Sequence, residues 1–169
     1  MLTQIVSIFA SIIALVIAFL TLKQLHFQTK GLVLLGCLEN YQRITRGREK
    51  AITNRSKREA HLYYREICDL HWTEFKMWES GAIPDHVIDV WIRARHYDYK
   101  NEYIEFENNE GVRVIVDYKT VWDSLKKKGY FQSEDSFTIF MDLAHHGEIE
   151  KALMIPNGQR NRFLSFLHT

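Results

Sequence analysis

The first 22 residues constrain this chain more than any other part of it. Residues 1–22 carry no charged side chain, and residues 5–22 are apolar except for Ser7, Ser11 and Thr21. At about 1.5 Å per helical residue this stretch is about 27 Å long, close to the roughly 30 Å thickness of a bilayer core. The segment therefore predicts one membrane-spanning helix.

The main alternative to a permanent span is a secretory signal that is removed after export. Such signals begin with basic residues and end at a motif of small residues. Residues 1–4 hold no Lys or Arg, and Lys23, His26 and Lys30 directly follow the apolar run, which favours an uncleaved anchor. Because basic residues stay on the cytoplasmic side, Lys23 and Lys30 predict a single-pass protein whose C-terminal domain is cytoplasmic.

One face of the expected helix carries small or weakly polar residues at spacings of three and four, which we call the small-residue seam. It consists of Gln4, Ser7, Ser11, Ala14, Ala18 and Thr21, and continues to Leu25 and Gln28. Small and weakly polar faces promote association of helices in lipid. The seam predicts a homo-oligomer: either a ring whose inward seam lines a pore, or a packed dimer or tetramer without a lumen.

The remainder of the chain has the composition of an ordered globular domain. The whole chain contains four Trp, eight Tyr, ten Phe and only two Pro, and its length after the anchor suffices for one core. We expect an anchor and juxtamembrane segment at residues 1–30 and a cytosolic helical domain at residues 31–169. The predicted fold class is all-α.

Periodicity and terminal signals place the helices of this domain. Ser56 with Glu59 has capping-box spacing, and Gly81, Gly129 and Gly147 follow segments with helical patterns. The expected helices are 56–79, 84–99, 118–128, one beginning near 133 or 136 and ending at 147, 148–154 and 159–167. For residues 103–116 we favour a helix end and a loop, with a β-hairpin as the alternative. At Gly31 either a break or a continuous helix fits.

Charge is unevenly distributed. Residues 1–62 hold nine Lys or Arg against three Glu, a net of +6, and residues 63–169 hold 13 against 18 acidic residues, a net of −5. The basic patch comprises Arg43, Arg46, Arg48, Lys50, Arg55, Lys57 and Arg58. Beside a membrane such a patch is expected to contact anionic lipid or the acidic part of a neighbouring subunit, and RNA phosphate is the alternative.

No strong catalytic motif is present. The chain lacks a phosphate-binding glycine loop, an HExxH sequence and a nucleophile elbow, so no metal or other cofactor is predicted. Cys37 and Cys68 lie in apolar surroundings and are expected to be buried thiols. His145 and His146 point about 100° apart on a helix and cannot chelate one ion by themselves.

Two Arg/His pairs are the candidate catalytic residues. Arg55 and His61 are separated by five residues, as are Arg162 and His168. This R-x(4–6)-H spacing is the hallmark of HEPN ribonucleases, in which His transfers a proton and Arg stabilises phosphate charge without a metal. Helical residues six apart do not eclipse one another, so the spacing alone does not bring either pair together, and enzymatic activity is not the favoured prediction.

With its N-terminal span, basic stretch, aromatic-rich helical domain and the Arg55/His61 spacing, the chain resembles the small membrane accessory protein of type VI-B CRISPR systems. The resemblance implies a divergent HEPN-like fold and a ring-shaped oligomer such as an octamer. It also implies a pore that depolarises the bacterial inner membrane during phage attack and enhances an RNA-targeting, RNA-guided effector protein. Active HEPN enzymes carry a polar residue directly after the Arg of the motif. In this chain Ser56 is the only candidate for that residue, which is a departure from the family pattern.

Two other functions remain open. The layout is also similar to membrane effectors of type III CRISPR systems, whose cytosolic domains bind a cyclic oligoadenylate, and a basic and aromatic pocket for it would draw on Arg93, Arg95, His96 and Tyr97. A passive membrane-tethered adaptor without conductance is the other alternative. Sequence leaves the stoichiometry, trigger and permeating species open.

Overall fold

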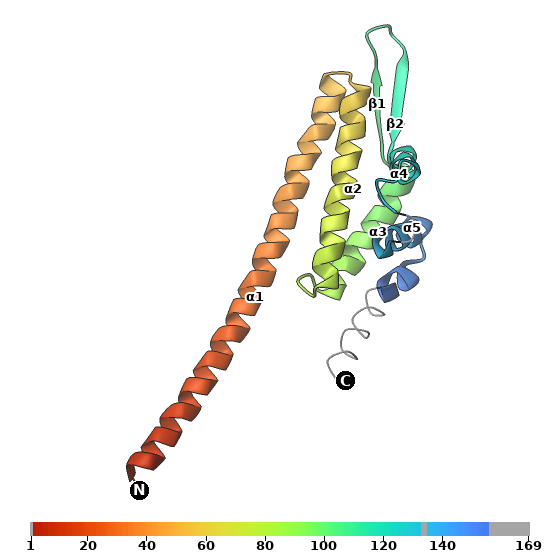
Figure 1. Ribbon diagram of the computed structural model, residues 1–169. Helices are drawn as coiled ribbons and strands as arrows, with labels where there is room; N and C mark the ends of the chain where they lie inside the picture. The colour runs from red at the N-terminus through yellow and green to blue at the C-terminus, as the bar shows by residue number, and fades with distance from the viewer. Residues whose placement is uncertain (1, 133–134, 156–169) are drawn as a thin grey trace. The chain divides into compact units, whose positions relative to one another are not determined.

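A computed structural model describes the backbone of residues 2–132 and 135–155 and the side chains of residues 13–132 and 135–155 (Figure 1). The chain divides into two compact units, residues 1–36 and residues 37–169. We describe each unit by itself. The described chain is mostly helical, as expected, and it also contains a two-stranded sheet.

Helix α1, Leu2–Thr53, is one continuous helix of 52 residues. Gly31, Gly36 and Gly47 lie within it, and none of them interrupts the helix. A glycine inside a helix costs about 1 kcal/mol relative to alanine, whereas a proline costs about 3 kcal/mol. Helix α1 contains glycine but no proline, so it can remain continuous. Of the two interpretations at Gly31, the continuous helix is therefore right.

The described apolar side chains near the start of the first unit are exposed. Residues 13–27 are all exposed, and the exposed fraction reaches 67% for Phe19 and 79% for Phe27. Among the residues whose side chains are described, no helix contains a stretch that is both long and apolar enough to cross a membrane. Residues 5–12 of the predicted span lie outside that set, so the span stays a prediction.

Helix α2, Lys57–Glu79, is the central helix of the second unit. Its N-cap is Ser56, whose hydroxyl oxygen accepts a hydrogen bond from the Glu59 backbone N–H at 3.2 Å. Only this half of the expected capping box forms. In the other half the Glu59 carboxylate would accept from the Ser56 backbone N–H, but it accepts from the Asn54 side chain instead. Beyond the C-terminus, Gly81 has a φ of 78°, a conformation that favours glycine. The predicted bounds are confirmed.

The remaining helices also begin and end close to their predicted positions. Helix α3, Asp85–Asn101, follows Pro84; α4, Tyr118–Lys127, is followed by Gly129; α5, Ser136–His146, ends at Gly147. Residues 149–155 are helical as well. Asp117 and Asp135 cap α4 and α5 through their side chains. The expected helix at 159–167 lies outside the described residues.

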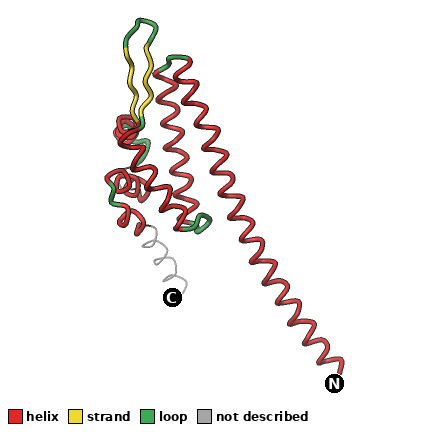
Figure 2. Tube along the Cα trace, turned by 180° about the vertical axis from the view of Figure 1, so that it is seen from behind, coloured by secondary structure: helices red, strands yellow, loops and turns green. Residues whose placement is uncertain are grey.

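The favoured interpretation, a helix end and a loop, is wrong for residues 103–117. They form an antiparallel hairpin of β1, Tyr103–Glu107, and β2, Arg113–Asp117, the yellow strands of Figure 2. Ile104 and Phe106 are buried and alternate with exposed residues, which is the period of a strand. In the turn the Asn108 side-chain oxygen accepts from the Glu110 and Val112 backbone N–H groups.

An aromatic cluster fills the core of the second unit. α2 packs against α4, and α3 packs against both α4 and α5. Edge-on and tilted ring contacts, the arrangements that aromatic pairs prefer, connect these helices. The largest fully buried rings belong to Tyr64, Phe75, Trp78, Tyr118, Trp122, Phe137 and Phe140. The two cysteines are free and buried, as predicted.

Candidate functional site: a basic cleft between α2 and α4

The two members of the first candidate pair, Arg55 and His61, occupy different environments. Arg55 lies in the turn between α1 and α2 with a φ of 50°, and its side chain is exposed. His61 lies on α2 and is half-buried. No hydrogen bond joins the two side chains, both of which the structure describes. The second pair, Arg162 and His168, lies outside the described residues.

The structure instead groups His61 with cationic residues that the spacing motif does not include. Arg58, His61 and Arg65 lie three and four residues apart on α2, and therefore on one face of that helix. This face lines a pocket of ≈ 480 Å³ that Lys128, at the C-terminus of α4, also lines. We call the pocket the basic cleft. Its other lining residues are Leu62, Val121, Ser124, Leu125 and Tyr130.

One wall of the basic cleft is fixed by a hydrogen-bond network. The Arg65 guanidinium donates to the Tyr130 hydroxyl at 3.1 Å and lies over the Tyr130 ring, 4.7 Å from its centroid. The Tyr130 hydroxyl in turn donates to the Asp69 carboxylate at 3.0 Å. Arg65 is thereby held in a defined orientation, which reduces the entropy lost when it binds a ligand.

The other nitrogen-bearing side chains of the cleft have no such partner. Among the described residues, no ion pair or hydrogen bond is formed by the side chains of Arg58, His61 or Lys128. Burial lowers the pKa of His61, and the positive charges of Lys57 and Lys128 lower it further. At neutral pH the imidazole is therefore mainly uncharged and keeps a lone pair that can accept a proton.

This arrangement can attract an anion and supply one proton acceptor. A phosphodiester in the basic cleft would meet the charges of Arg58, Arg65 and Lys128 beside the neutral imidazole of His61. Cations stabilise charge that develops on phosphate, and a nearby imidazole can act as general base. None of the lining residues is acidic, and the Asp69 carboxylate behind one wall accepts a hydrogen bond from the Tyr130 hydroxyl and lies 3.9 Å from Arg65.

The remaining members of the basic patch lie outside the cleft. Their side chains are exposed along the last turns of α1 and the first turn of α2. Arg43 is 3.8 Å from Glu66, Lys50 is 4.0 Å from Glu59, and Arg48 donates to the Tyr103 carbonyl at 3.4 Å. Exposed pairs of this kind contribute little to stability, so the patch remains available to an anionic surface.

The residues suggested for a cyclic oligoadenylate pocket have different partners. Arg93 pairs with Asp89 at the surface, and Tyr97 is exposed. The His96 ring contacts the Ala144 and His145 carbonyls at the end of α5. Arg95 is buried and forms an ion pair with Glu74. Successive helical residues point about 100° apart, so this stretch does not converge on one ligand.

The Glu74–Arg95 pair is a feature that sequence reasoning missed. Both side chains are almost completely buried between α2 and α3, and the Arg95 guanidinium also lies 5.7 Å from the Trp91 ring centroid. Burial raises the pKa of Glu74, which the charge of Arg95 opposes. The only available signal was one acid on the otherwise apolar face of α2. Its partner, 21 residues away, could not be identified from that signal.

The described part of the chain contains no group of three or more His, Cys, Asp or Glu side chains suited to hold a metal ion. Burial raises the pKa of Cys37 to about 11 and that of Cys68 to about 12, so neither thiol is a reactive thiolate at neutral pH. No protein-family model, curated protein or solved structure matches this chain.

Proposed function

We propose that this chain is a single-pass membrane protein that self-associates through α1 and perturbs the membrane as an accessory effector in antiphage defence. The observation that carries the membrane assignment is the exposure of every described side chain from residue 13 to residue 27. Seven of the ten residues 13–22 are large and apolar. Burying such a surface in lipid gains about 25 cal/mol per Å².

The distribution of these residues around the helix supports self-association. At 100° per residue, the large apolar side chains of residues 13–22 leave one sector free of bulk, and Ala14, Ala18 and Thr21 fall within it. Small residues allow two helix backbones to approach closely in lipid. The Thr21 hydroxyl donates to the Ile17 carbonyl at 2.9 Å, so it enters an apolar environment with its donor satisfied.

The charges that follow the apolar segment fit a cytoplasmic location of the second unit. Lys23 and Lys30 lie directly after the predicted span, and basic residues are retained on the cytoplasmic side. The exposed basic patch contributes further charge. Each basic residue near an anionic surface adds about 1 kcal/mol of attraction. The resemblance to the type VI-B accessory proteins suggests the bacterial inner membrane and a ring with a lumen.

Ion flux through vesicles that contain the full-length protein tests this proposal. We expect dye release or conductance from the wild type. Replacing small residues with bulky ones (Ala14→Ile with Ala18→Ile) should separate the helices, lower the subunit count in detergent and abolish flux. The matched control, Leu15→Ile with Leu20→Ile, changes two large apolar positions outside the small-residue seam and should retain flux. A monomeric wild type, or equal flux from both variants, would refute pore formation by the seam.

A second function, binding and cleavage of RNA, is favoured by the contents of the basic cleft. His61 accompanies three cationic side chains there, without a carboxylate among the lining residues. Incubation of the full-length protein with single-stranded RNA and EDTA tests for metal-independent cleavage. His61→Ala should abolish cleavage, whereas replacing an exposed histidine of α3, His86→Ala, should not. RNA binding without cleavage would restrict the cleft to an RNA-recognition role. If the protein neither binds nor cleaves RNA, this second function is ruled out.

A further inference from the structure

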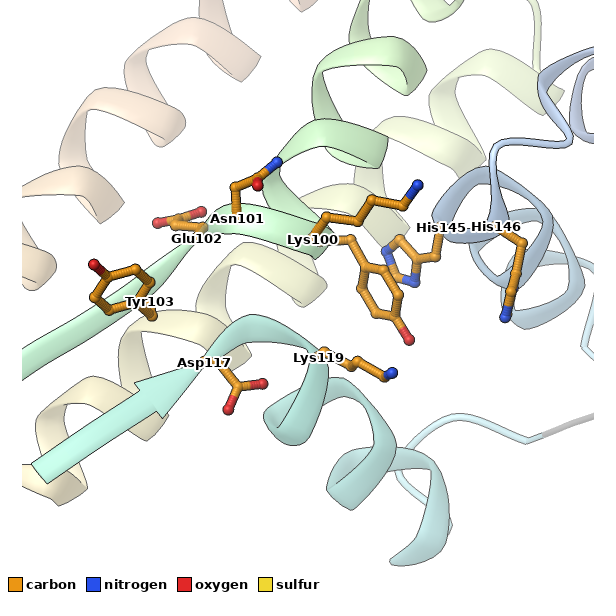
Figure 3. A pocket seen from close by; sticks show the side chains of 9 residues that line it. Lys100, Asn101, Glu102, Tyr103, Asp117, Lys119, His145 and His146 are labelled. Atoms are coloured by element: carbon orange, nitrogen blue, oxygen red, sulfur yellow. The ribbon is translucent and has the colours of Figure 1, made fainter.

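A second pocket lies at the junction of α3, the hairpin, α4 and α5, and its residues belong to none of the sites described above. Its volume is ≈ 500 Å³, within the range of small-molecule sites. Figure 3 shows its side chains from close by. We call it the polar pocket; it is lined by Tyr99, Lys100, Asn101, Glu102, Tyr103, Asp117, Lys119, His145 and His146.

His145 in the wall of this pocket is a buried polar side chain without a partner. Its exposed fraction is 1%, and neither Nδ1 nor Nε2 forms a hydrogen bond. The ring stacks on Tyr99 with centroids 3.9 Å apart and an angle of 3° between the planes. Buried polar groups are normally hydrogen-bonded, and leaving one unpaired costs about 1–3 kcal/mol. Both nitrogens are covered by the surrounding residues, so His145 contributes a stacked ring to the wall of the pocket and no hydrogen bond to a ligand.

The cationic residues of the polar pocket gather at one end. Figure 3 places Lys100 and Lys119 toward His145 and His146. Among the described residues, neither lysine forms an ion pair or a side-chain hydrogen bond. The Nδ1–H of His146 donates to the Asp142 carbonyl, which leaves its Nε2 unused. This end therefore carries two unpaired positive charges.

The opposite end is acidic and aromatic. Glu102, Tyr103 and Asp117 lie there in Figure 3. Glu102 accepts a hydrogen bond from Tyr63 at 2.8 Å, and Asp117 accepts from the Thr120 N–H at 2.7 Å. These bonds fix the carboxylates, and each still has free acceptor sites. Half of the Tyr103 side chain is exposed, so one face of its ring can stack on a planar group.

We propose that the polar pocket binds a nucleoside monophosphate, with its phosphate between Lys100 and Lys119 and its sugar hydroxyls directed to Glu102 and Asp117. Carboxylates are suitable acceptors for ribose hydroxyls, and lysine is a common phosphate ligand. Tyr103 provides a surface for the base. This inference uses none of the residues of the membrane anchor or the basic cleft and does not depend on their function.

Isothermal titration of the full-length protein in detergent with AMP tests this assignment, with adenosine and ribose 5-phosphate as comparison ligands. We expect AMP to bind at least about tenfold more tightly than either, because adenosine lacks the phosphate and ribose 5-phosphate lacks the base. Equal affinity for adenosine would overturn the role of the lysines. Equal affinity for ribose 5-phosphate would overturn the assignment to a nucleotide, and absence of AMP binding would overturn the whole proposal.

Matched variants locate the site. Lys119→Gln should weaken AMP binding about tenfold, whereas Lys127→Gln, an exposed lysine later on the same helix, should not change it. Lys100→Gln removes the other unpaired charge of the pocket, so it should also weaken binding while the fold is retained by circular dichroism. Binding that is unchanged by both Lys119→Gln and Lys100→Gln would place AMP elsewhere and contradict the proposal.

Discussion

The two units of this protein use apolar residues in opposite ways. In the first unit, the described side chains from residue 13 to residue 27 are all exposed, including large ones such as Phe19 and Phe27. In the second unit, large apolar rings such as Trp78, Trp122 and Phe140 are buried in contact with other rings. The hydrophobic effect favours the burial of apolar surface in both units. Only the second unit buries its large apolar rings among its own residues. In the first unit, the described side chains of residues 13–27 have no such cover from the described residues.

The largest effect is expected from placing charge in the exposed apolar segment. Val16→Lys with Leu20→Lys should remove the protein from membranes, because each lysine opposes insertion by about 3 kcal/mol. The fraction retained in membranes after alkaline extraction measures the change. A lysine at an exposed apolar position of α3, Val90→Lys, is the control and should leave that fraction unchanged. Full retention of the double variant would show that residues 16 and 20 are not in the bilayer.

The next largest effect is expected from breaking the buried Glu74–Arg95 ion pair, which tests how the core of the second unit is stabilised. Glu74→Ala should destabilise the second unit by about 3–5 kcal/mol, because it leaves the charge of Arg95 buried and unpaired. Urea unfolding followed by tryptophan fluorescence measures the loss. The double variant Glu74→Leu with Arg95→Leu should recover much of it, since no charge then remains buried. If Glu74→Ala unfolds at the wild-type midpoint, the pair is not buried in solution.

Acid should weaken the second unit through its buried histidines. Burial, with cationic neighbours including Lys126, lowers the pKa of His145 to about 2, and burial also holds the pKa of His71 well below its ordinary value. The unfolded state therefore binds more protons below about pH 6.5, and stability falls as pH falls.

From pH 6.5 to pH 5, each of these histidines should remove about 2 kcal/mol from the free energy of unfolding. Denaturant midpoints measured across this range check the slope. The variant His145→Phe should eliminate the part of this pH-dependent loss that His145 causes and retain the part that His71 causes. A slope identical to the wild type would mean that His145 titrates normally in the folded protein.

The smallest effect is expected at the helix cap. Ser56→Ala should cost about 1 kcal/mol, because the Glu59 N–H loses its hydrogen-bond acceptor at the start of α2. The same unfolding assay measures it. Ser56→Asp restores an acceptor and should return the midpoint toward the wild-type value. If alanine is tolerated without loss, the cap does not contribute to the stability of the second unit.

Local signals predicted much of the fold. The Ser56 cap and Gly81, Gly129 and Gly147 marked helix ends that the structure confirms. These signals act over a few residues, so they survive packing. The hairpin was misjudged because its alternation of buried Ile104 and Phe106 with glutamates also suits a polar helix end. Contact of these two side chains with the core decides between the alternatives, and sequence does not reveal that contact.

The candidate sites were less predictable. Sequence identified His61 but paired it with Arg55, whereas its companion in the basic cleft, Lys128, lies 67 residues away along the chain. One alternative hypothesis placed Arg95 in a ligand pocket, whereas the structure buries it against Glu74. Spacing within a helix indicates which residues share a face. It does not indicate which other element that face meets.

The sequence by itself determined the apolar, uncharged N-terminal segment, the helical character of the rest and the basic patch, because composition and short-range periodicity fix these features. Only the tertiary structure decided that Arg58, His61 and Lys128 line one cleft and that His145 is buried without a partner beside Lys100 and Lys119. The physical reason is that convergence of side chains depends on how distant helices pack, and close packing is a property of the whole core.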